Sequence, residues 1–270
     1  MNYFWKVQIS IPKVLSKNKI KLVNSLDLKK YRLAMGLFVA EGKKLVFDLL
    51  ESELEIHELF ATTSISSELR SYKSDIHFEI VEKEELAKIS FLKATPEIIG
   101  IFKVPNLVID WNEIGKGLTI VLDAVQDPGN LGTIVRLADW FGIKDIVCSP
   151  DCADLYNPKT VQATMGALAR VKVHYLFLHE FLDQAKKLGL LIYGTFLEGE
   201  NIYNCELSDN GIIVMGNEGK GISGNVAEFV SRKVSIPPFP PDGSTSESLN
   251  VAIATSVICS EFRRRVICKG

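Results

Sequence analysis

The chain has 270 residues, of which 47% are hydrophobic and 24% charged, and its net charge at pH 7 is −2. These values are typical of a globular protein with one large or two medium domains, and they exclude a protein coated in positive charge. No apolar run approaches the roughly 20 residues of a membrane-spanning helix, so we expect no membrane partner. Residues 1–21 mix apolar residues with lysines, and the five cysteines are scattered without zinc spacing. We therefore expect no signal peptide, reduced thiols, no metal and a cytoplasmic location.

Positive charge is concentrated near the N-terminus. Residues 1–44 carry 10 lysines and arginines against 2 acidic residues, a net charge of +8, whereas residues 45–105 carry 6 against 12. A basic surface gains affinity for nucleic acid because phosphates release counterions when it binds. Two interpretations stay open here, a phosphate-contacting surface and a solvated basic face. The residues concerned are Lys13, Lys17, Lys19, Lys21, Lys29, Lys30, Arg32, Lys43 and Lys44.

The first part of the chain alternates short apolar runs with helical segments. Residues 1 to about 20 have the character of an extended or poorly ordered arm. After them we expect helices at 28–35, 43–50, 66–71 and 83–89, and strands at 37–40, 56–61, 78–81 and 98–104. This alternation predicts a compact α/β domain over residues 1–105, which includes the basic arm.

A polar segment at 106–117 predicts a linker, and a second α/β domain follows over residues 118–270. Its first strand, 118–122, is continuously apolar, as is typical of a strand buried in a parallel sheet. The turn at 127–130 leads into a helix that Gly142 ends. The other elements that we expect are strands at 145–148, 171–175, 190–196, 211–215 and 233–236, and helices at 131–141, 158–168, 178–188, around 226 and at 246–264.

A glycine-rich segment, 216–221, follows the strand at 211–215. Ligands bind at the carboxyl ends of strands in open α/β sheets, and glycine lets the backbone approach a ligand or adopt a positive φ. The segment matches neither the P-loop nor the dinucleotide-binding pattern. Its alternative interpretation is a glycine-rich surface turn.

A second motif stands at the start of the helix after the 127–130 turn. Asn130 and Gly132 are followed one turn later by Arg136, within the reach of i, i+4 geometry. A helix N-terminus with an asparagine and an arginine suits an anion or an RNA phosphate. The alternative is an asparagine N-cap next to a surface arginine.

A third motif, Ser248-Leu249-Asn250, comes at the start of the last predicted helix. The proline-rich stretch 237–243 before it cannot form regular structure and predicts a shaped loop, whose role the sequence leaves open. The alternative is a capping motif in which residue 244, 245 or 246 begins the helix.

Together the three motifs resemble the signature motifs of the SpoU (TrmH-type) branch of SPOUT RNA 2′-O-ribose methyltransferases. The motifs are Asn130-x-Gly132-x-x-x-Arg136, Val214-Met215-Gly216-Asn217-Glu218-Gly219-x-Gly221, and Ile236-Pro237 with Ser248-Leu249-Asn250-Val251. The N-terminal domain, with Arg32 and residues 38–42, is similar to the L30-like substrate-binding domain of many rRNA members. The chain departs from the family in its longer proline-rich stretch and in Ala252, where many members have serine.

The resemblance implies an S-adenosylmethionine (AdoMet)-dependent enzyme that methylates ribose 2′-hydroxyls of RNA. The L30-like domain favours ribosomal RNA over tRNA as the substrate. The implied fold is α/β, with a trefoil-knotted C-terminal domain of a parallel sheet flanked by helices, and the implied assembly is a homodimer with sites near its interface. A non-catalytic RNA-binding or assembly protein that kept the fold is the alternative of a different class.

The resemblance also implies roles for single residues. Those implied for RNA binding and catalysis are Arg136, Asn130, Glu218, Ser248 and Asn250. Those implied for the cofactor are Thr195, Phe196, Leu197, Gly216, Asn217, Gly221, Ile236, Pro237 and Leu249. The family assigns Arg136 to the proton of the hydroxyl. Because arginine stays protonated near neutral pH, we favour an electrostatic stabiliser of the developing alkoxide, and a base role stays open.

Overall fold

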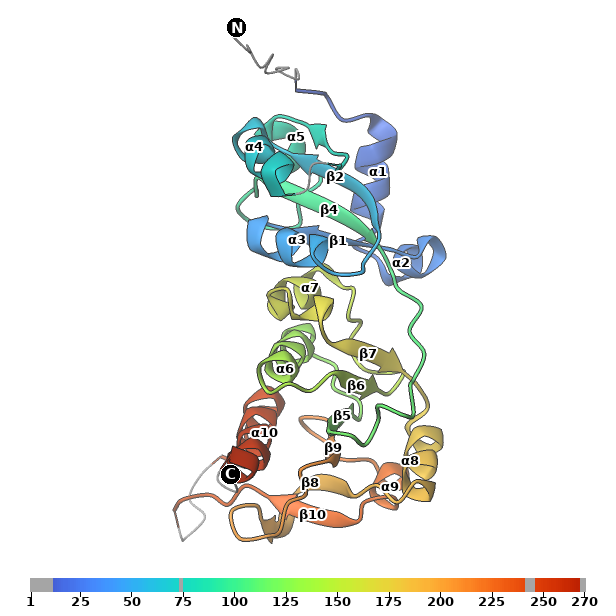
Figure 1. The fold of residues 1–270 in the computed structure, drawn as a ribbon, viewed down its shortest axis with the longest axis vertical. Coiled ribbons are helices and arrows are strands. Elements are labelled where there is room, and N and C mark those ends of the chain that lie inside the picture. The colour runs from blue at the N-terminus through green and yellow to red at the C-terminus, as the bar shows by residue number, and fades with distance from the viewer. Residues whose placement is uncertain (1–11, 73–74, 241–245, 268–270) are drawn as a thin grey trace, which may run out of the picture. The chain divides into compact units, whose positions relative to one another are not determined.

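The structure is a computed structural model that describes residues 12–72, 75–240 and 246–267. The chain divides into two compact units, Met1–Pro105 and Asn106–Gly270 (Figure 1). Within the described ranges, no helix combines the length and apolarity that crossing a bilayer requires. The same ranges hold no group of three or more His, Cys, Asp or Glu side chains placed to share a metal ion.

The first unit is a mixed four-stranded sheet with helices on both faces. The strand order is β1-β4-β2-β3, with β3 parallel to β2 and the other pairs antiparallel. Leu37 and Val39 of the first strand join one buried cluster, whereas Phe38 between them stacks on Phe102 with ring centroids 5.7 Å apart. The elements are α1 (Lys17–Ser25), α2 (Lys29–Met35), β1 (Leu37–Glu41), α3 (Lys43–Leu50), β2 (Ile56–Ala61), α4 (Thr63–Tyr72), β3 (Glu79–Ile80), α5 (Lys83–Ala87) and β4 (Ile98–Lys103).

The prediction of an extended arm to residue 20 is wrong from residue 17 onward, and residues 1–11 lie outside the described residues. Ser16 begins α1, where its hydroxyl accepts a hydrogen bond from the Lys19 amide at 3.3 Å. Val23 and the following Leu26 are fully buried. The lysine-rich first turn hides this helix in the sequence, because its buried residues come only in the second half.

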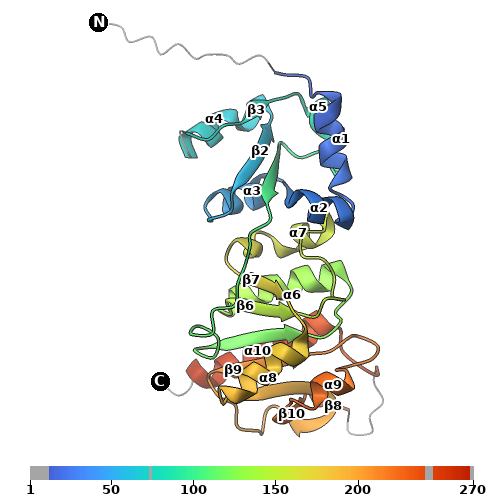
Figure 2. The same ribbon diagram turned by 90° about the vertical axis from the view of Figure 1, so that its right-hand side faces the viewer.

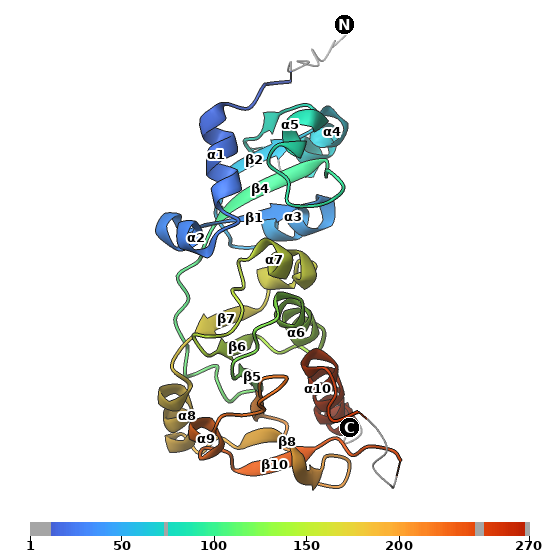
Figure 3. The same cartoon turned by 180° about the vertical axis from the view of Figure 1, so that it is seen from behind.

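The second unit is a six-stranded parallel sheet in the order β10-β8-β9-β5-β6-β7. Figures 1 and 3 show α6 and α10 on one face and α8 and α9 on the other. Both faces are therefore covered, which explains the continuous apolar runs of the central strands. The elements are β5 (Leu118–Leu122), α6 (Pro128–Trp140), β6 (Asp145–Cys148), α7 (Pro158–Thr164), β7 (Lys172–Tyr175), α8 (Leu178–Lys187), β8 (Ile192–Asn201), β9 (Gly211–Met215), α9 (Gly224–Ala227), β10 (Arg232–Ser235) and α10 (Val251–Ile267).

Strand order alone does not describe how the chain threads, so the trefoil knot stays a prediction. The view in Figure 2 shows α8 and α9 in front of the sheet of this unit. Phe181 of α8 and Val226 of α9 pack in one buried cluster with Ile212 and Val214 of β9. This packing fixes the central strands, whose carboxyl ends carry the motifs.

Capping residues move the start of two helices away from the predicted positions. α6 begins at Pro128 rather than 131, because the Asp127 carboxylate accepts a hydrogen bond from the Asn130 amide at 2.7 Å. α10 begins at Val251 rather than 246, because the Asn250 side-chain oxygen accepts from the amides of the residues two and three positions on, at 3.0 and 3.3 Å. Residues 244 and 245, considered as caps, lie outside the described residues.

The predicted helix 158–168 is also too long. It ends at Thr164, since Met165 adopts φ 52° in the left-handed region, and a short 3₁₀ turn at Ala167–Ala169 follows. A left-handed residue cannot continue an α-helix.

Candidate active site

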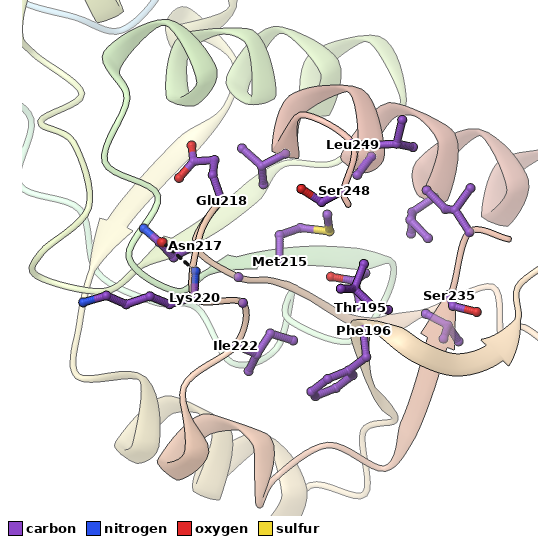
Figure 4. A pocket seen from close by; sticks show the side chains of 18 of the residues that line it. Thr195, Phe196, Met215, Asn217, Glu218, Lys220, Ile222, Ser235, Ser248 and Leu249 are labelled. Carbon is purple, nitrogen blue, oxygen red and sulfur yellow. Dashed lines mark hydrogen bonds between the residues drawn. The ribbon is translucent and has the colours of Figure 1, made fainter. Parts of the chain in front are cut away.

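The motif residues gather where neighbouring parallel strands end. The end of β10, the middle of β8 and the loop after β9 line one pocket of about 630 Å³. In Figure 4, Met215 lies near its centre, with Ser248 and Leu249 on one side and Phe196 and Ile222 on the other. The carboxyl edge of the sheet is therefore the candidate site, as expected for an open α/β sheet.

Eight of the nine residues expected to contact the cofactor lie in the wall of this pocket. Pro237 is the exception, although Ile236 before it lines the wall. The eight are Thr195, Phe196, Leu197, Gly216, Asn217, Gly221, Ile236 and Leu249.

A bulge in β8 builds one wall of the pocket. Gly194 pairs with Lys233 of β10, but the next residue of β10 pairs with Glu200, so residues 195–199 are looped out between the two pairings. Gly199 is required where the bulge returns, because a Cβ there would lie 2.7 Å from the backbone carbon of Val234. The predicted strand 190–196 covers only the first half of this element, since the bulge depends on a partner strand elsewhere in the sequence.

The glycine loop after β9 is closed by its own hydrogen bonds. Asn217 and Gly221 exchange two backbone hydrogen bonds of 3.0 and 2.9 Å. The Asn217 side-chain oxygen accepts from the amides of Gly219 and Lys220 at 3.0 and 3.1 Å. Gly221 has φ 70°, which glycine adopts without strain. The loop is thus shaped by the chain itself.

Position 216 requires glycine because of the packing of the loop itself, whether or not a ligand is bound. A Cβ at this position would lie 2.2 Å from the carbonyl carbon of Gly221 and 2.3 Å from the nitrogen of Ile222, both backbone atoms. By contrast, a Cβ at Gly219 would meet only the Asn217 side chain, at 3.7 Å. The three glycines of the motif therefore serve different purposes.

Three of the residues implied for catalysis form one hydrogen-bonded relay. The Asn250 amide nitrogen donates to the Asn130 side-chain oxygen at 3.0 Å, and the Asn130 amide nitrogen donates to the Glu218 carboxylate at 2.8 Å. Because the Asn250 oxygen is occupied in capping α10, its nitrogen must face Asn130. That contact leaves the Asn130 nitrogen facing Glu218. The relay joins residues 120 positions apart and fixes both amide orientations.

Arg136 and Ser248 stand outside the relay. Ser248 is exposed and lines the pocket. Arg136 lies on α6 with an exposed side chain and does not line the pocket, and no described residue forms a hydrogen bond or ion pair with it. Gly132, one turn earlier, packs where a Cβ would lie 2.5 Å from the Ala163 Cβ of α7. The Arg136 side chain is therefore exposed to solvent, although α6, which carries it, packs tightly against α7.

Sequence reasoning missed three residues of the site. Asp123 and Ala124, directly after β5, bond to the two ends of the glycine loop. Lys233 of β10 places its ammonium 4.9 Å from the centre of the Phe196 ring, and both side chains line the pocket. The only local signal for Asp123 is an acidic residue directly after a buried apolar strand.

Two family models match the chain, one in each unit. Residues 117–260 match the SpoU rRNA methylase family, and residues 17–100 match the MRM3-like substrate binding domain. The chain belongs to the SpoU rRNA methylase family. The SpoU match includes the pocket, the relay and Arg136, so the resemblance in the motifs is confirmed at the level of the family.

Several RNA methyltransferases and their solved structures align with nearly the whole chain. The 23S rRNA (guanosine(2553)-2′-O)-methyltransferase RlmP of Bacillus subtilis is 28% identical over 249 residues, 91% of this chain and 96% of RlmP. A putative RNA methyltransferase of the TrmH family from Porphyromonas gingivalis is 39% identical, with a TM-score of 0.83 over 94% of this chain and 100% of that one. The AdoMet-bound rRNA methyltransferase from Sinorhizobium meliloti is 27% identical, with a TM-score of 0.82 over 95% of this chain and 97% of that one.

Proposed function

We propose that this chain transfers the methyl group of AdoMet to a ribose 2′-hydroxyl of 23S ribosomal RNA. The observation that carries the proposal is the joining of the pocket and the relay. Glu218 lines the pocket and also accepts the hydrogen bond from Asn130. The Glu218 carboxylate thus connects the glycine loop, which is implied for the cofactor, with Asn130, which is implied for RNA.

The pocket fits AdoMet in size and in the chemistry of its wall. A volume of about 630 Å³ lies within the range of roughly 300–1,000 Å³ typical of small-molecule sites. Met215, Ile222 and Leu249 offer apolar contacts, while the looped-out backbone of β8 and the glycine loop offer polar groups. When bound, AdoMet supplies an electrophilic methyl group.

The chain's own residues then have to hold the ribose and manage its proton. A ribose hydroxyl is a weak acid, so its attack on a methyl group needs stabilisation of the developing negative charge. Arg136 offers a guanidinium that remains available for an RNA hydroxyl or phosphate. The relay holds Asn130 and Glu218 in one arrangement, so that no side-chain rotation has to be completed when RNA binds. Ser248 adds a hydroxyl at the pocket wall.

The proposed RNA surface of the first unit is smaller than the charge count predicts. Arg32 is buried and donates to two backbone oxygens at 2.6 and 2.7 Å, so it is not part of the exposed basic surface. Lys19 is held between Glu58 and Glu79, Lys43 pairs with Glu68, and Lys44 pairs with Asp48. Within the basic stretch 12–44, the lysines that are exposed and form no ion pair with described residues are Lys13, Lys17, Lys21, Lys29 and Lys30.

The proposal includes a homodimer. Trp140 at the end of α6 is 84% exposed, and Ile253 and Ile267 of α10 are 54% and 77% exposed. α6 and α10 pack against each other, and we propose that these side chains belong to the surface that the second copy covers, as is typical of an exposed apolar patch. A second copy also fits the position of Arg136, which does not line the pocket of its own chain. The proposal further includes a cytoplasmic location, since ribosomal RNA is the substrate and the four described cysteines are free thiols.

The deciding experiment measures methyl transfer from labelled AdoMet to purified rRNA and, separately, to tRNA. We expect labelled 23S rRNA, ribose methylation at one nucleotide, and loss of that methyl group in cells that lack the gene. Labelled tRNA with unlabelled rRNA would contradict the substrate. RNA binding without AdoMet binding in calorimetry would contradict the enzymatic activity and leave a binding protein.

A further inference from the structure

Two consecutive residues after β5 hold both ends of the glycine loop. At the start of the loop, the Asn217 side-chain nitrogen donates to the Ala124 carbonyl at 2.7 Å. At its end, one carboxylate oxygen of Asp123 accepts from the Ser223 amide at 2.7 Å and from the Ser223 hydroxyl at 2.6 Å. The loop between these points, 216–222, lines the pocket.

The two holding residues are themselves fixed. Asp123 is 7% exposed, and its amide donates to the Met215 carbonyl at 2.9 Å. Ala124 has φ 57°, a left-handed conformation that residues with a Cβ seldom adopt, and its amide donates to the Ser149 hydroxyl at 2.9 Å. Strained backbone of this kind persists only where its surroundings enforce it. Here the left-handed turn aims the Ala124 carbonyl at Asn217.

Neither Asp123 nor Ala124 lines the pocket, so each acts on a ligand only through the loop. The hydrogen bonds to Asp123 are charge-assisted and nearly buried, which makes them the stronger of the two attachments. A loop attached at one end only would sample positions in which its backbone groups no longer face the pocket. Binding AdoMet would then require ordering the loop, which weakens affinity.

We propose that Asp123 is a positioning residue for AdoMet, which sets the affinity of the pocket by anchoring the end of the loop at Ser223. This inference rests on the proposed function, because it takes AdoMet as the ligand. It assigns Asp123 no contact with cofactor or RNA. It makes Ser223 the partner through which the carboxylate acts.

Calorimetry of AdoMet binding to the full-length chain separates positioning from general stability. In Asp123→Asn the side chain still accepts a hydrogen bond but loses its charge, and we expect the Kd to rise about tenfold at unchanged stoichiometry. Ser223→Ala keeps the backbone hydrogen bond and loses the hydroxyl, so we expect a rise of about threefold. In the double variant the Kd should rise by less than the product of the two single increases, because both substitutions remove parts of the same interaction.

The matched control is Asp145→Asn. The Asp145 carboxylate bonds to the His174 ring at 3.0 Å in the same sheet but has no contact with the loop. We expect its variant to keep the AdoMet Kd within about twofold of the wild type, even if its melting temperature falls. A purely structural role for Asp123 would lower the binding stoichiometry and leave the Kd unchanged.

An unchanged Kd in Asp123→Asn, or an equal rise in Asp145→Asn, would overturn the inference. Wild-type protein that fails to bind AdoMet would instead contradict the proposed function. The two failures are therefore distinguishable in one series of titrations.

Discussion

The glycine loop and the exposed face of α6 differ in how many of their polar groups the chain already satisfies. In the loop, the Asn217 side chain makes three hydrogen bonds, and Asp123 and Ala124 hold the ends. On α6, Arg136 has no hydrogen bond or ion pair within the described part of the chain. The part proposed for a small cofactor is preorganised, whereas the part proposed for RNA is left exposed.

The same difference separates the lysines of the first unit. Lys19, Lys43 and Lys44 are neutralised by acidic partners. Lys17 and Lys21 of α1 are exposed, and no described residue pairs with them. RNA releases counterions into solution for each phosphate that an unpaired lysine neutralises, so an exposed lysine contributes to RNA binding without being held in one position beforehand. We therefore expect the paired lysines to stabilise the first unit, and the unpaired lysines to contact RNA phosphates.

The largest effect should come from the unsatisfied group of α6. We expect Arg136→Ala to lower the rate of methyl transfer by about 10²–10³, because the group that would stabilise the developing negative charge is lost. AdoMet affinity should stay within about twofold of wild type, since the arginine does not line the pocket. Single-turnover methylation with saturating AdoMet measures the rate.

Two variants make this result specific. Arg136→Lys should recover little activity, because an ammonium lacks the planar forked donors of a guanidinium. Arg170, which forms an ion pair with Asp139 of α6 at 2.7 Å, is the matched control, and Arg170→Ala should keep the rate within a few-fold of wild type. A near-wild-type rate in Arg136→Ala would remove this arginine from the mechanism.

The next largest effect should come from the satisfied loop. Gly216→Ala adds one methyl group that overlaps the backbone of Gly221 and Ile222, so the loop must shift. Overpacking of this kind destabilises by about 1–3 kcal/mol. We expect AdoMet affinity to fall by about 10–100-fold, in proportion to that free energy, and the melting temperature to fall by several degrees.

Gly219→Ala is the control for the stability of the loop. Its added methyl group meets only the Asn217 side chain at an ordinary distance, so the melting temperature should stay at the wild-type value. Equal decreases of melting temperature in the two alanine variants would mean that the overlap at Gly216 is not the cause of the lost stability.

The sequence predicted those features of the site that depend only on residues close together in the chain. The continuous apolar run of β5 follows from burial on both faces, and the glycine at Gly221 follows from a positive φ. The anchor at Asp123 could not be predicted, because its partner is 100 positions away. The bulge of β8 likewise depends on the backbone of β10. Sequence spacing shows which residues are unusual but not which distant residue each one meets.

A smaller effect should come from the relay, where two substitutions of Asn250 separate its two bonds. Asn250→Asp keeps an oxygen that caps α10, and its charge suits a helix N-terminus. However, an ionised aspartate has no donor for the Asn130 oxygen. If the Asn130 amide turns to donate to Asp, its oxygen then faces Glu218 instead. In both arrangements the relay loses a hydrogen bond.

We therefore expect Asn250→Asp to keep the melting temperature and to lower the methylation rate by about tenfold, as for the loss of one hydrogen bond. Asn250→Ala should show the same decrease in rate and in addition about 1 kcal/mol less stability, because the cap is removed as well. Denaturant unfolding and single-turnover rates measure the two effects. A full rate in Asn250→Asp would show that Asn250 serves only to cap α10 and that its hydrogen bond to Asn130 is not needed for methyl transfer.

The smallest effect should come from the exposed lysines of α1. Lys17 and Lys21 lie one turn apart on this helix, so one RNA segment reaches both side chains. We expect the double variant K17Q/K21Q to weaken RNA binding a few-fold at moderate salt, and to reduce the slope of log affinity against log salt by about 0.7–0.9 for each phosphate that is no longer neutralised.

The control is K43Q/K44Q, which removes the same charge from residues that already have acidic partners, so its slope should stay close to wild type. Filter binding of rRNA over a range of salt concentrations measures both slopes. Because the two variants have the same net charge, equal slopes would mean that RNA responds to the total charge of the first unit, and the distinction between satisfied and unsatisfied lysines would then carry no information about where RNA binds.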